Sequence, residues 1–365
     1  MGLTLFNKDA LRASVEAASG GQVTVHYDDK GYPSFMFVVP KFNLQDIDAS
    51  LGTGVHPAFI VNGVEKSYVH IGQYQAIVKD SRAVFIPGVD PATSVNFDHA
   101  RTYCANKGPG WHLMTNAEWA ALMLWCWKNN FFPRGNTDYG RSYAATYETA
   151  RRVDGGTPGS TSGTPRTYTG SGPVSWRHNN SPNGIADLVG NIWEWVGGLR
   201  LNVGEIQILQ NNNAADNTKD QGAASAEWKA ILADGSLVAP GTANTLKYDS
   251  VNAGTTGVVG AAQLDNVIDN SNAPASGDDG CCSNAFKDLA ADTGITAPAL
   301  LKQLLLFPHA ADLVGQLYVR NYGERLPIRG GSLDSQGAGG PFALYLHNPR
   351  SGSGSNLGFR PALII

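Results

Sequence analysis

Apolar and polar residues alternate in short runs along the first fifth of the chain. Residues 22–27 place apolar side chains at every second position, the period of a strand with one buried face, and residues 35–39 form a second apolar run. Two further apolar runs, 59–61 and 68–71, lie on either side of Asn62-Gly63. Because Asn-Gly is a preferred dipeptide of two-residue hairpin turns, we expect these two runs to pair as a β-hairpin.

Two longer stretches have the spacing and the end signals of helices. The first covers residues 93–106 and the second covers residues 113–127. In the second, Thr115 and Glu118 stand three positions apart, as in a capping box that satisfies the first free amide groups of a helix. Apolar residues then occur on nearly every side, so we expect this helix to be deeply buried.

The C-terminal part of the chain contains an alternating stretch. Within residues 342–347, Leu344 and Leu346 would face the core, while Tyr345 and His347 would face outward. A strand of this kind has one fixed face and one face that is free to contact other molecules.

The pattern also divides the chain. Residues 1–48 form a small N-terminal segment, and residues 49–365 form one larger domain. Residues 201–320 are predicted to be an insertion, because much of this stretch is rich in Ala, Asn, Asp and Gly and has few large apolar residues to form a core of its own. Residues 328–365 are the C-terminal region, and their apolar end, 357–365, is expected to be a central closing strand.

Composition limits the classes of function. Only 16% of the 365 residues are charged, 42% are hydrophobic and 43 are glycine, so the chain can bury a large core beneath a loop-rich surface of small polar side chains. The net charge of −4 gives no basic footprint for nucleic acid, and no apolar run is long enough to span a membrane. Residues 1–22 lack the basic and apolar regions of a signal peptide, so we expect a soluble protein without a cleaved signal.

The cysteines and histidines do not form a known catalytic or metal-binding motif. Cys104 and Cys126 lie in apolar surroundings and are expected in the core. The adjacent Cys281 and Cys282 lie in a stretch of Asp, Gly and Ser, where we expect a loop with thiols that are free or bonded elsewhere. The eight histidines are dispersed along the chain, and no two of them are four positions apart.

One arrangement of carboxylates could bind a cation. Asp187 and Glu194 bracket a tight turn, and the backbone carbonyls of Gly190 and Ile192 could complete an oxygen shell for calcium. Alternatively, Asp187 caps the turn and Glu194 pairs with an arginine. The spacing of the residues allows both arrangements.

Four blocks occur in the order found in a known family. They are residues 57–59, residues 110–119, the block 184–195 that ends in Gly-Asn-Ile-Trp-Glu-Trp, and Arg-Gly-Gly-Ser at 329–332 followed by Asn-Leu-Gly-Phe-Arg at 356–360. The sequence thereby resembles the formylglycine-generating-enzyme (sulfatase-modifying factor) family, a branch of the C-type-lectin fold. The resemblance implies an α+β fold that is loop-rich, with short strands and two main helices. It also strengthens the calcium hypothesis at the segment matching Asp187, Gly190, Ile192 and Glu194.

The enzymes of this family use two cysteines shortly after the Arg-Gly-Gly-Ser block to hold copper. Here Ser335 and Gly340 stand at the matching places, and residues 328–365 contain no cysteine. A hydroxyl or a hydrogen cannot replace a thiolate as a soft copper ligand. We therefore expect no catalytic residues and no required cofactor. The alternative is a metal-dependent oxidoreductase of the same family that uses a site without cysteine.

The C-terminal region also resembles a second branch of the fold, the variable proteins of diversity-generating retroelements. That resemblance implies framework residues and, between them, ligand-facing positions diversified from asparagine codons. The matching positions are Ser332, Leu333, Asp334, Ser335, Gly337, Gly339, Tyr345, His347, Ser351, Gly352, Ser353 and Gly354. Their types suit recognition, because Tyr brings contact area at a low entropy cost while Ser and Gly adapt to a partner.

We interpret the sequence as that of a non-catalytic, ligand-binding (receptor-recognition) protein that displays a diversified C-terminal surface. The expected partner is a protein or another cell-surface macromolecule, with no nucleic acid and no membrane insertion. We expect synthesis in the cytoplasm and a final place on a virion tail or at the cell surface. A structural phage tail protein with a fixed partner is a further alternative.

Overall fold

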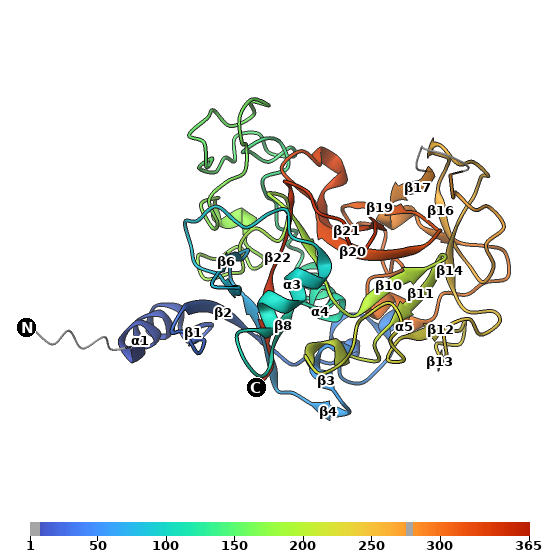
Figure 1. The fold of residues 1–365 in the computed structure, drawn as a ribbon, viewed down its shortest axis with the longest axis horizontal. Coiled ribbons are helices and arrows are strands. Elements are labelled where there is room, and N and C mark those ends of the chain that lie inside the picture. Colours follow the sequence, from blue (N-terminus) through green and yellow to red (C-terminus); the bar gives the residue numbers. More distant parts are fainter. Residues whose placement is uncertain (1–7, 275–279) are drawn as a thin grey trace, which may run out of the picture.

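The computed structural model describes residues 8–274 and 280–365 (Figure 1). Residues 1–7 of the predicted N-terminal segment and residues 275–279 of the predicted insertion lie outside these ranges. Short strands and loops surround a few helices, so the α+β, loop-rich architecture is confirmed. In the described ranges, no helix combines the length and the apolar character needed to cross a membrane.

The helices agree with the sequence in part. They are α1 (Lys8–Ser19), α2 (Leu44–Ile47), α3 (Phe97–Ala105), α4 (Asn116–Lys128) and α5 (Ala299–Gln303). Helix α3 begins later than the expected residue 93, because the side chain of Asn96 caps it by accepting the amide of His99 at 2.9 Å. In α4 the predicted capping box is confirmed: the Thr115 hydroxyl accepts the amide of Glu118 at 3.1 Å, and the Glu118 carboxylate accepts the amide of Thr115 at 2.9 Å.

A five-stranded sheet joins the two ends of the chain. Its order is β1 (Val23–Tyr27), β2 (Pro33–Pro40), β5 (Tyr68–Gly72), β23 (Pro361–Leu363) and β8 (Trp111–Leu113). Residues on both sides of the boundary predicted after residue 48 therefore share one sheet. The figure shows β1 and β2 next to α1, on one side of the molecule (Figure 1).

The predicted hairpin has the correct turn but the wrong second strand. Asn62 and Gly63 both have a positive φ, 50° and 76°, as a tight hairpin turn requires. The turn pairs β3 (Ile60–Val61) with β4 (Val64–Glu65), and β5 pairs with β2 and β23 instead. The remaining short hairpin joins β6 (Ile77–Lys79) and β7 (Arg82–Val84).

A larger sheet carries the C-terminal region and the insertion. Its main path is β15 (Gly257–Val258), β17 (Gly280–Ala285), β19 (Gln316–Val319), β21 (Gly340–Asn348), β20 (Glu324–Gly330), β10 (Leu199–Asn202), β11 (Glu205–Ile208), β14 (Lys247–Ser250), β16 (Ala262–Asp265) and β18 (Ala290–Ala291). Off this path lie β9 (Trp193–Trp195), β22 (Leu357–Phe359), β12 (Lys229–Ile231) and β13 (Leu237–Val238). The insertion therefore extends the main sheet, and its Leu246, Tyr248 and Leu264 are buried in the main core.

The prediction of one closing strand over residues 357–365 is wrong. Strand β22 pairs with β9 in the larger sheet, and β23 lies between β5 and β8 in the other sheet. The chain crosses from one sheet to the other at Arg360, whose side chain is completely buried. An apolar run that serves two sheets looks the same in sequence as a single strand.

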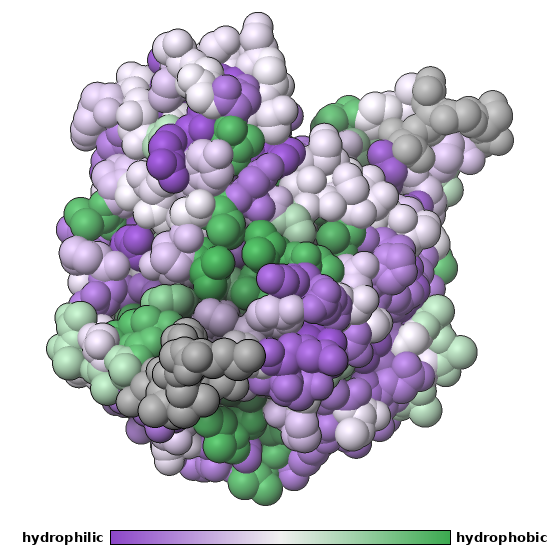
Figure 2. All heavy atoms as spheres, turned by 60° about the vertical axis from the view of Figure 1, so that its left-hand side comes forward, coloured by the Kyte–Doolittle hydropathy of each residue, from purple (hydrophilic) through white to green (hydrophobic). Residues whose placement is uncertain are grey.

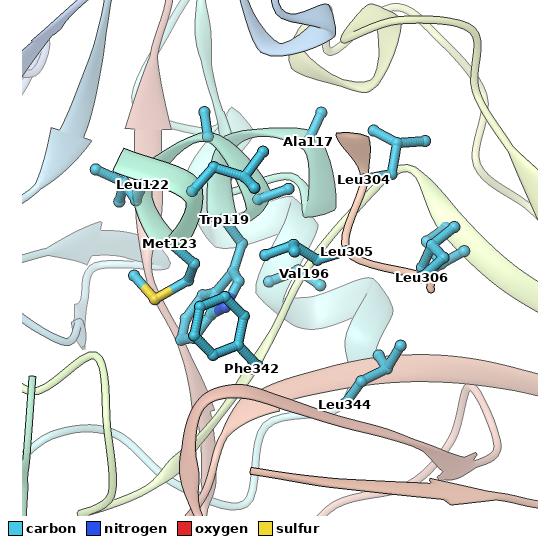
Figure 3. Packing of buried hydrophobic residues seen from close by; sticks show 14 of the residues in the cluster. Ala117, Trp119, Leu122, Met123, Val196, Leu304, Leu305, Leu306, Phe342 and Leu344 are labelled. Atoms are coloured by element: carbon cyan, nitrogen blue, oxygen red, sulfur yellow. The ribbon is translucent and has the colours of Figure 1, made fainter. Parts of the chain in front are cut away.

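Helix α4 lies at the centre of the core, where the strands of the C-terminal region pack against it. Trp119 and Met123 lie close to Phe342, and the indole of Trp119 donates to the carbonyl of Pro341 at 3.0 Å (Figure 3). The helix is buried on most sides, as its sequence predicts. This packing fixes the position of β21. On the surface, Figure 2 turns the side with α1 forward and shows apolar residues gathered near the middle of that face.

Candidate functional site

Two glycines fix the turn that leads into the predicted variable segment. Gly330 and Gly331 have φ values of 88° and 102°, which favour glycine. A Cβ on Gly330 would lie 2.3 Å from the carbonyl oxygen of Leu188, so no larger residue fits there. Strands β20 and β21 flank this turn, and residues 331–339 form the loop between them.

The loop has a buried base and an exposed tip. The Ser332 hydroxyl donates to Asp334 at 2.6 Å, and the Ser332 amide donates to the Ser335 hydroxyl at 2.8 Å. Asp334 and Gly337 are exposed, and Leu333 and Ser335 are half-buried. The structure does not favour Ser332 as a ligand-facing residue, because it is buried at the base of the loop; Gly339 is also buried, but it lines the hollow beside the loop.

Strand β21 confirms the predicted alternation. Leu344 and Leu346 are completely buried, while Tyr345 and His347 are half-buried on the other face. The Tyr345 ring lies between the rings of Trp193 and Tyr318, at centroid distances of 4.4 and 5.0 Å. Burial raises the pKa of the Tyr345 hydroxyl to about 12, and this hydroxyl donates to the side chain of Gln316. Tyr345 is therefore packed within an aromatic cluster.

Asn356 links the base of the loop 331–339 to the aromatic cluster around Tyr345. Its side-chain amide donates to the Ser332 hydroxyl at 3.3 Å, and its carbonyl accepts the amide of Trp193, whose ring contacts Tyr345, at 2.8 Å. Just before Asn356, Ser351 and Ser353 are exposed. In the same stretch Gly352 and Gly354 are half-buried. The loop tip, the outer face of β21 and the Ser/Gly stretch are thus connected to one framework.

A hollow of about 250 Å³ adjoins the loop tip. Two residues at its rim were not predicted, Tyr143 and Val314, which are 52% and 48% exposed. A Cβ on Gly337 would lie 3.6 Å from the Tyr143 ring, so the two sites are in contact. No sequence signal singles these residues out, because Val314 directly follows Leu313 and Tyr143 is followed by two alanines. The hollow is lined by Phe132, Pro133, Arg134, Gly135, Thr137, Ser142, Tyr143, Ala144, Val189, Val314, Gln336, Gly337, Gly339, Gly340 and Pro341.

In the segment predicted to bind calcium, Glu194 pairs with an arginine, as in the alternative arrangement, whereas Asp187 bonds to a distant loop and does not cap the turn. The Arg360 guanidinium donates to both carboxylate oxygens of Glu194, at 2.9 and 2.7 Å, and both side chains are buried. Asp187 accepts the amide of Gly170 at 2.7 Å, and burial raises the pKa of its carboxyl group. Beside them, the carbonyl of Ile192 accepts a hydrogen bond from Gln75.

These contacts leave little room for a cation at Glu194. Among residues 8–274 and 280–365, no three His, Cys, Asp or Glu side chains gather as a metal site would require. Calcium coordination by Asp187, Gly190, Ile192 and Glu194 stays a prediction, and it requires Glu194 to exchange Arg360 for a cation.

The thiols lie away from the hollow. Cys104 and Cys126 are buried, and burial raises the pKa of both. Cys281 and Cys282 lie on strand β17 and are also buried, so the prediction of a loop there is wrong. The reason is that β17 pairs with β19 within the larger sheet, which the polar residues around it do not reveal.

Comparison with known proteins identifies the family. A family model described as "Sulfatase-modifying factor enzyme 1-like domain" matches residues 14–219, which is more than half of the chain. No curated protein matches the sequence significantly.

Two solved structures align with nearly the whole chain. Treponema denticola variable protein 1 is 12% identical, with a TM-score of 0.33 over 93% of this chain and 98% of that one. PvdO from Pseudomonas aeruginosa is 14% identical, with a TM-score of 0.31 over 94% of this chain and 98% of that one. At these scores, neither structure bears on the function of this chain. The match over residues 14–219 shows that the chain belongs to the sulfatase-modifying factor enzyme 1-like family.

Proposed function

We propose that the chain is a non-catalytic, ligand-binding (receptor-recognition) protein, and that its C-terminal region forms the binding surface. The carrying observation is the loop of residues 331–339. It projects small side chains from a rigid turn, and Ser335 and Gly340 stand where the resemblance places the catalytic cysteines of the enzymes. The proposed surface consists of this loop tip, residues 351–354 and the hollow beside Tyr143, and we name it the recognition surface.

The chemistry of the hollow supports binding rather than catalysis. Its lining residues, all of them in the described ranges, include no thiol, imidazole or carboxylate. A hydroxyl needs a neighbouring base to act as a nucleophile. The hydroxyl of Ser335, in the loop beside the hollow, accepts a backbone amide and lies 3.2 Å from the Ser332 hydroxyl, which itself donates to the exposed carboxylate of Asp334.

The space around individual positions supports diversification at some of them. A Cβ on Gly337 would meet only the Tyr143 ring, at ordinary contact distance. Asp334, Ser351 and Ser353 are exposed. A Cβ on Gly339, by contrast, would lie 3.1 Å from Thr137 and 3.2 Å from Ser335, so this glycine is held by the framework.

The shape of the surface suits a protein or another cell-surface macromolecule. The half-exposed Tyr143 and Val314 offer an apolar rim, and a hollow of about 250 Å³ can accept one large side chain of a partner. Tyrosine at a rim of this kind is typical of recognition surfaces. We place the protein on a virion tail or at the cell surface, where such a partner would be met.

Two matched display libraries test this proposal. The first randomises Asp334, Gly337, Ser351 and Ser353, and the second randomises the equally exposed Val203, Val251, Val258 and Val267. Both are selected against the same unrelated, folded target protein. We expect specific binders from the first library only, because its positions lie on the loop tip and on the stretch 351–354, and Gly337 lines the hollow, whereas the second set lies outside the proposed surface.

Equal yields of binders from both libraries would contradict a dedicated recognition surface. Two further observations would favour the alternative functions. Stoichiometric copper or iron in the purified protein, lost on substitution of particular histidines, would favour the oxidoreductase alternative. Stable incorporation into virions without sequence variation would favour a structural tail protein.

A further inference from the structure

A second cavity lies apart from the recognition surface. It is an apolar cleft of about 550 Å³ between strand β2, helix α4 and the loop that begins at residue 178. None of its lining residues belongs to the C-terminal region 328–365. Its volume falls in the range of about 300–1,000 Å³ that is typical of small-molecule sites. Most of its wall is apolar, including Phe37, Val38, Leu122 and Trp125.

A buried histidine that lines this cleft, His178, has one ring nitrogen without a protein partner in the described residues. His178 is only 2% exposed, and its Nδ1 accepts the amide of Ile185 at 2.9 Å. Burial lowers the pKa of His178 to about 3, so its ring is neutral at pH 7. An imidazole that is neutral and accepts at Nδ1 carries its proton on Nε2. No residue in the described part of the chain accepts a hydrogen bond from this Nε2.

The rings around His178 define the shape of a ligand. The centroid of the Phe37 ring lies 4.5 Å from that of His178 in an edge arrangement, and the Trp125 ring lies 5.5 Å away at a tilt. Trp125 is half-buried, and within residues 8–274 and 280–365 its indole N–H donates to no protein group. Aromatic walls favour a ligand with a flat apolar ring system, because rings pack well in offset-stacked and edge-to-face arrangements. An oxygen acceptor on such a ligand could accept a hydrogen bond from Nε2 of His178.

The charges nearby favour an anionic acceptor. Arg177 and Arg360 are both buried near His178, where their positive charge acts on its ring. Arg360 is neutralised by Glu194. Arg177 donates to the carbonyls of Gly184 and Gly170; in the described structure it makes no direct ion pair, although its charge favours the ionised form of Asp187. A carboxylate is therefore better suited to this cleft than an ammonium group.

We propose that the cleft is a binding site for a small aromatic carboxylate, whose oxygen accepts a hydrogen bond from Nε2 of His178. The aromatic body would lie against Phe37 and Trp125, beside Val38 and Leu122. This site is independent of the recognition surface, because the two share no residue.

Calorimetric titration of the full chain tests the proposal, with 2-naphthoate as the probe and 1-(2-naphthyl)methanamine as a cation of similar shape. Val38→Trp fills the cleft from a half-buried position, and Val258→Trp places the same ring on an exposed strand elsewhere. We expect saturable binding of 2-naphthoate to the wild type and to Val258→Trp. Binding should be about tenfold weaker in Val38→Trp, and the amine should bind the wild type about tenfold more weakly, as for the loss of one charge-assisted hydrogen bond.

A third variant tests the role of the hydrogen-bond donor, Nε2 of His178. His178→Phe keeps a ring in the wall and removes Nε2, so it should reduce the preference for the carboxylate over the amine. If this variant fails to fold, the comparison of Val38→Trp with Val258→Trp still decides. Equal binding of 2-naphthoate to those two variants, equal binding of the amine and the carboxylate to the wild type, or no binding of 2-naphthoate would overturn the proposal. None of these results changes the prediction for the two libraries.

Discussion

Replacement of Arg360 by methionine should strongly destabilise the fold. Arg360 is completely buried and donates to Glu194 twice, to Gly72 at 2.9 Å and to Ala186 at 2.9 Å. Methionine removes all four hydrogen bonds and leaves the Glu194 carboxylate, only 1% exposed, with the single side-chain donor Gln75. Removing one partner of a buried ion pair costs about 3–5 kcal/mol.

The assay is urea unfolding, followed by thermal unfolding. With an unfolding entropy of about 2.1 cal/mol/K per residue, this cost corresponds to a decrease of about 4–7 °C in Tm for a chain of this length. The matched control is Lys41→Met, which breaks the exposed pair with Glu65 and should cost less than about 1 kcal/mol. The double variant Arg360→Met/Glu194→Met should regain most of the loss, because it leaves no unpaired charge.

The result that would refute the reasoning is equally clear. If Arg360→Met behaves like Lys41→Met, Glu194 has another source of stabilisation and the pair does not hold the two sheets together. Titration of the Arg360→Met variant with calcium then tests whether a cation can take the place of Arg360 beside Glu194. Restoration of stability by calcium would show that Glu194 can act as a cation ligand, as the sequence resemblance implies.

Three further predictions concern the framework. Thr115→Ala removes the cap of α4 and should lower the free energy of unfolding by about 1 kcal/mol in urea titrations, whereas an unchanged midpoint would contradict the capping role. Gly339→Leu should lower Tm by several times as much as Gly337→Leu does. The reason is that a Cβ on Gly339 meets close neighbours and a Cβ on Gly337 does not. Equal decreases in Tm would contradict this. Burial lowers the pKa of His56 to about 4 from 6.5, so this residue binds more protons in the unfolded chain between these values. His56 alone should therefore raise the free energy of unfolding with pH from about 4 to 6.5, by at most about 1.4 kcal/mol per pH unit. His56→Gln should reduce that slope in urea titrations at a series of pH values, and an unchanged slope would assign the dependence to other groups.

Features that depend on neighbours in sequence could be predicted. The capping box of Thr115 and Glu118 lies within one helical turn, so the chain specifies it locally. The alternation of Leu344 and Tyr345 is likewise set by the period of a strand, and the structure confirms it. The turn at Asn62-Gly63 is correct for the same reason.

Features that depend on distant partners could not be predicted. Tyr143 reaches Gly337 only because the loops that carry them pack side by side, which no local pattern reveals. The burial of Ser332 follows from its contacts with Ser335 and Asn356. The sequence allowed Glu194 either a cation or an arginine, and the choice of Arg360 depends on two strands that are far apart along the chain.

The most direct test of the central claim is to sequence this gene in many clones from one natural population. The account predicts differences concentrated at the exposed positions, Asp334, Gly337, Ser351 and Ser353, beside a nearby template copy of the 3′ end and a reverse transcriptase gene. Ser332 and Gly339, which are buried, should vary less. Uniform clones without a template copy, or differences spread evenly over the framework, would contradict a diversified recognition surface.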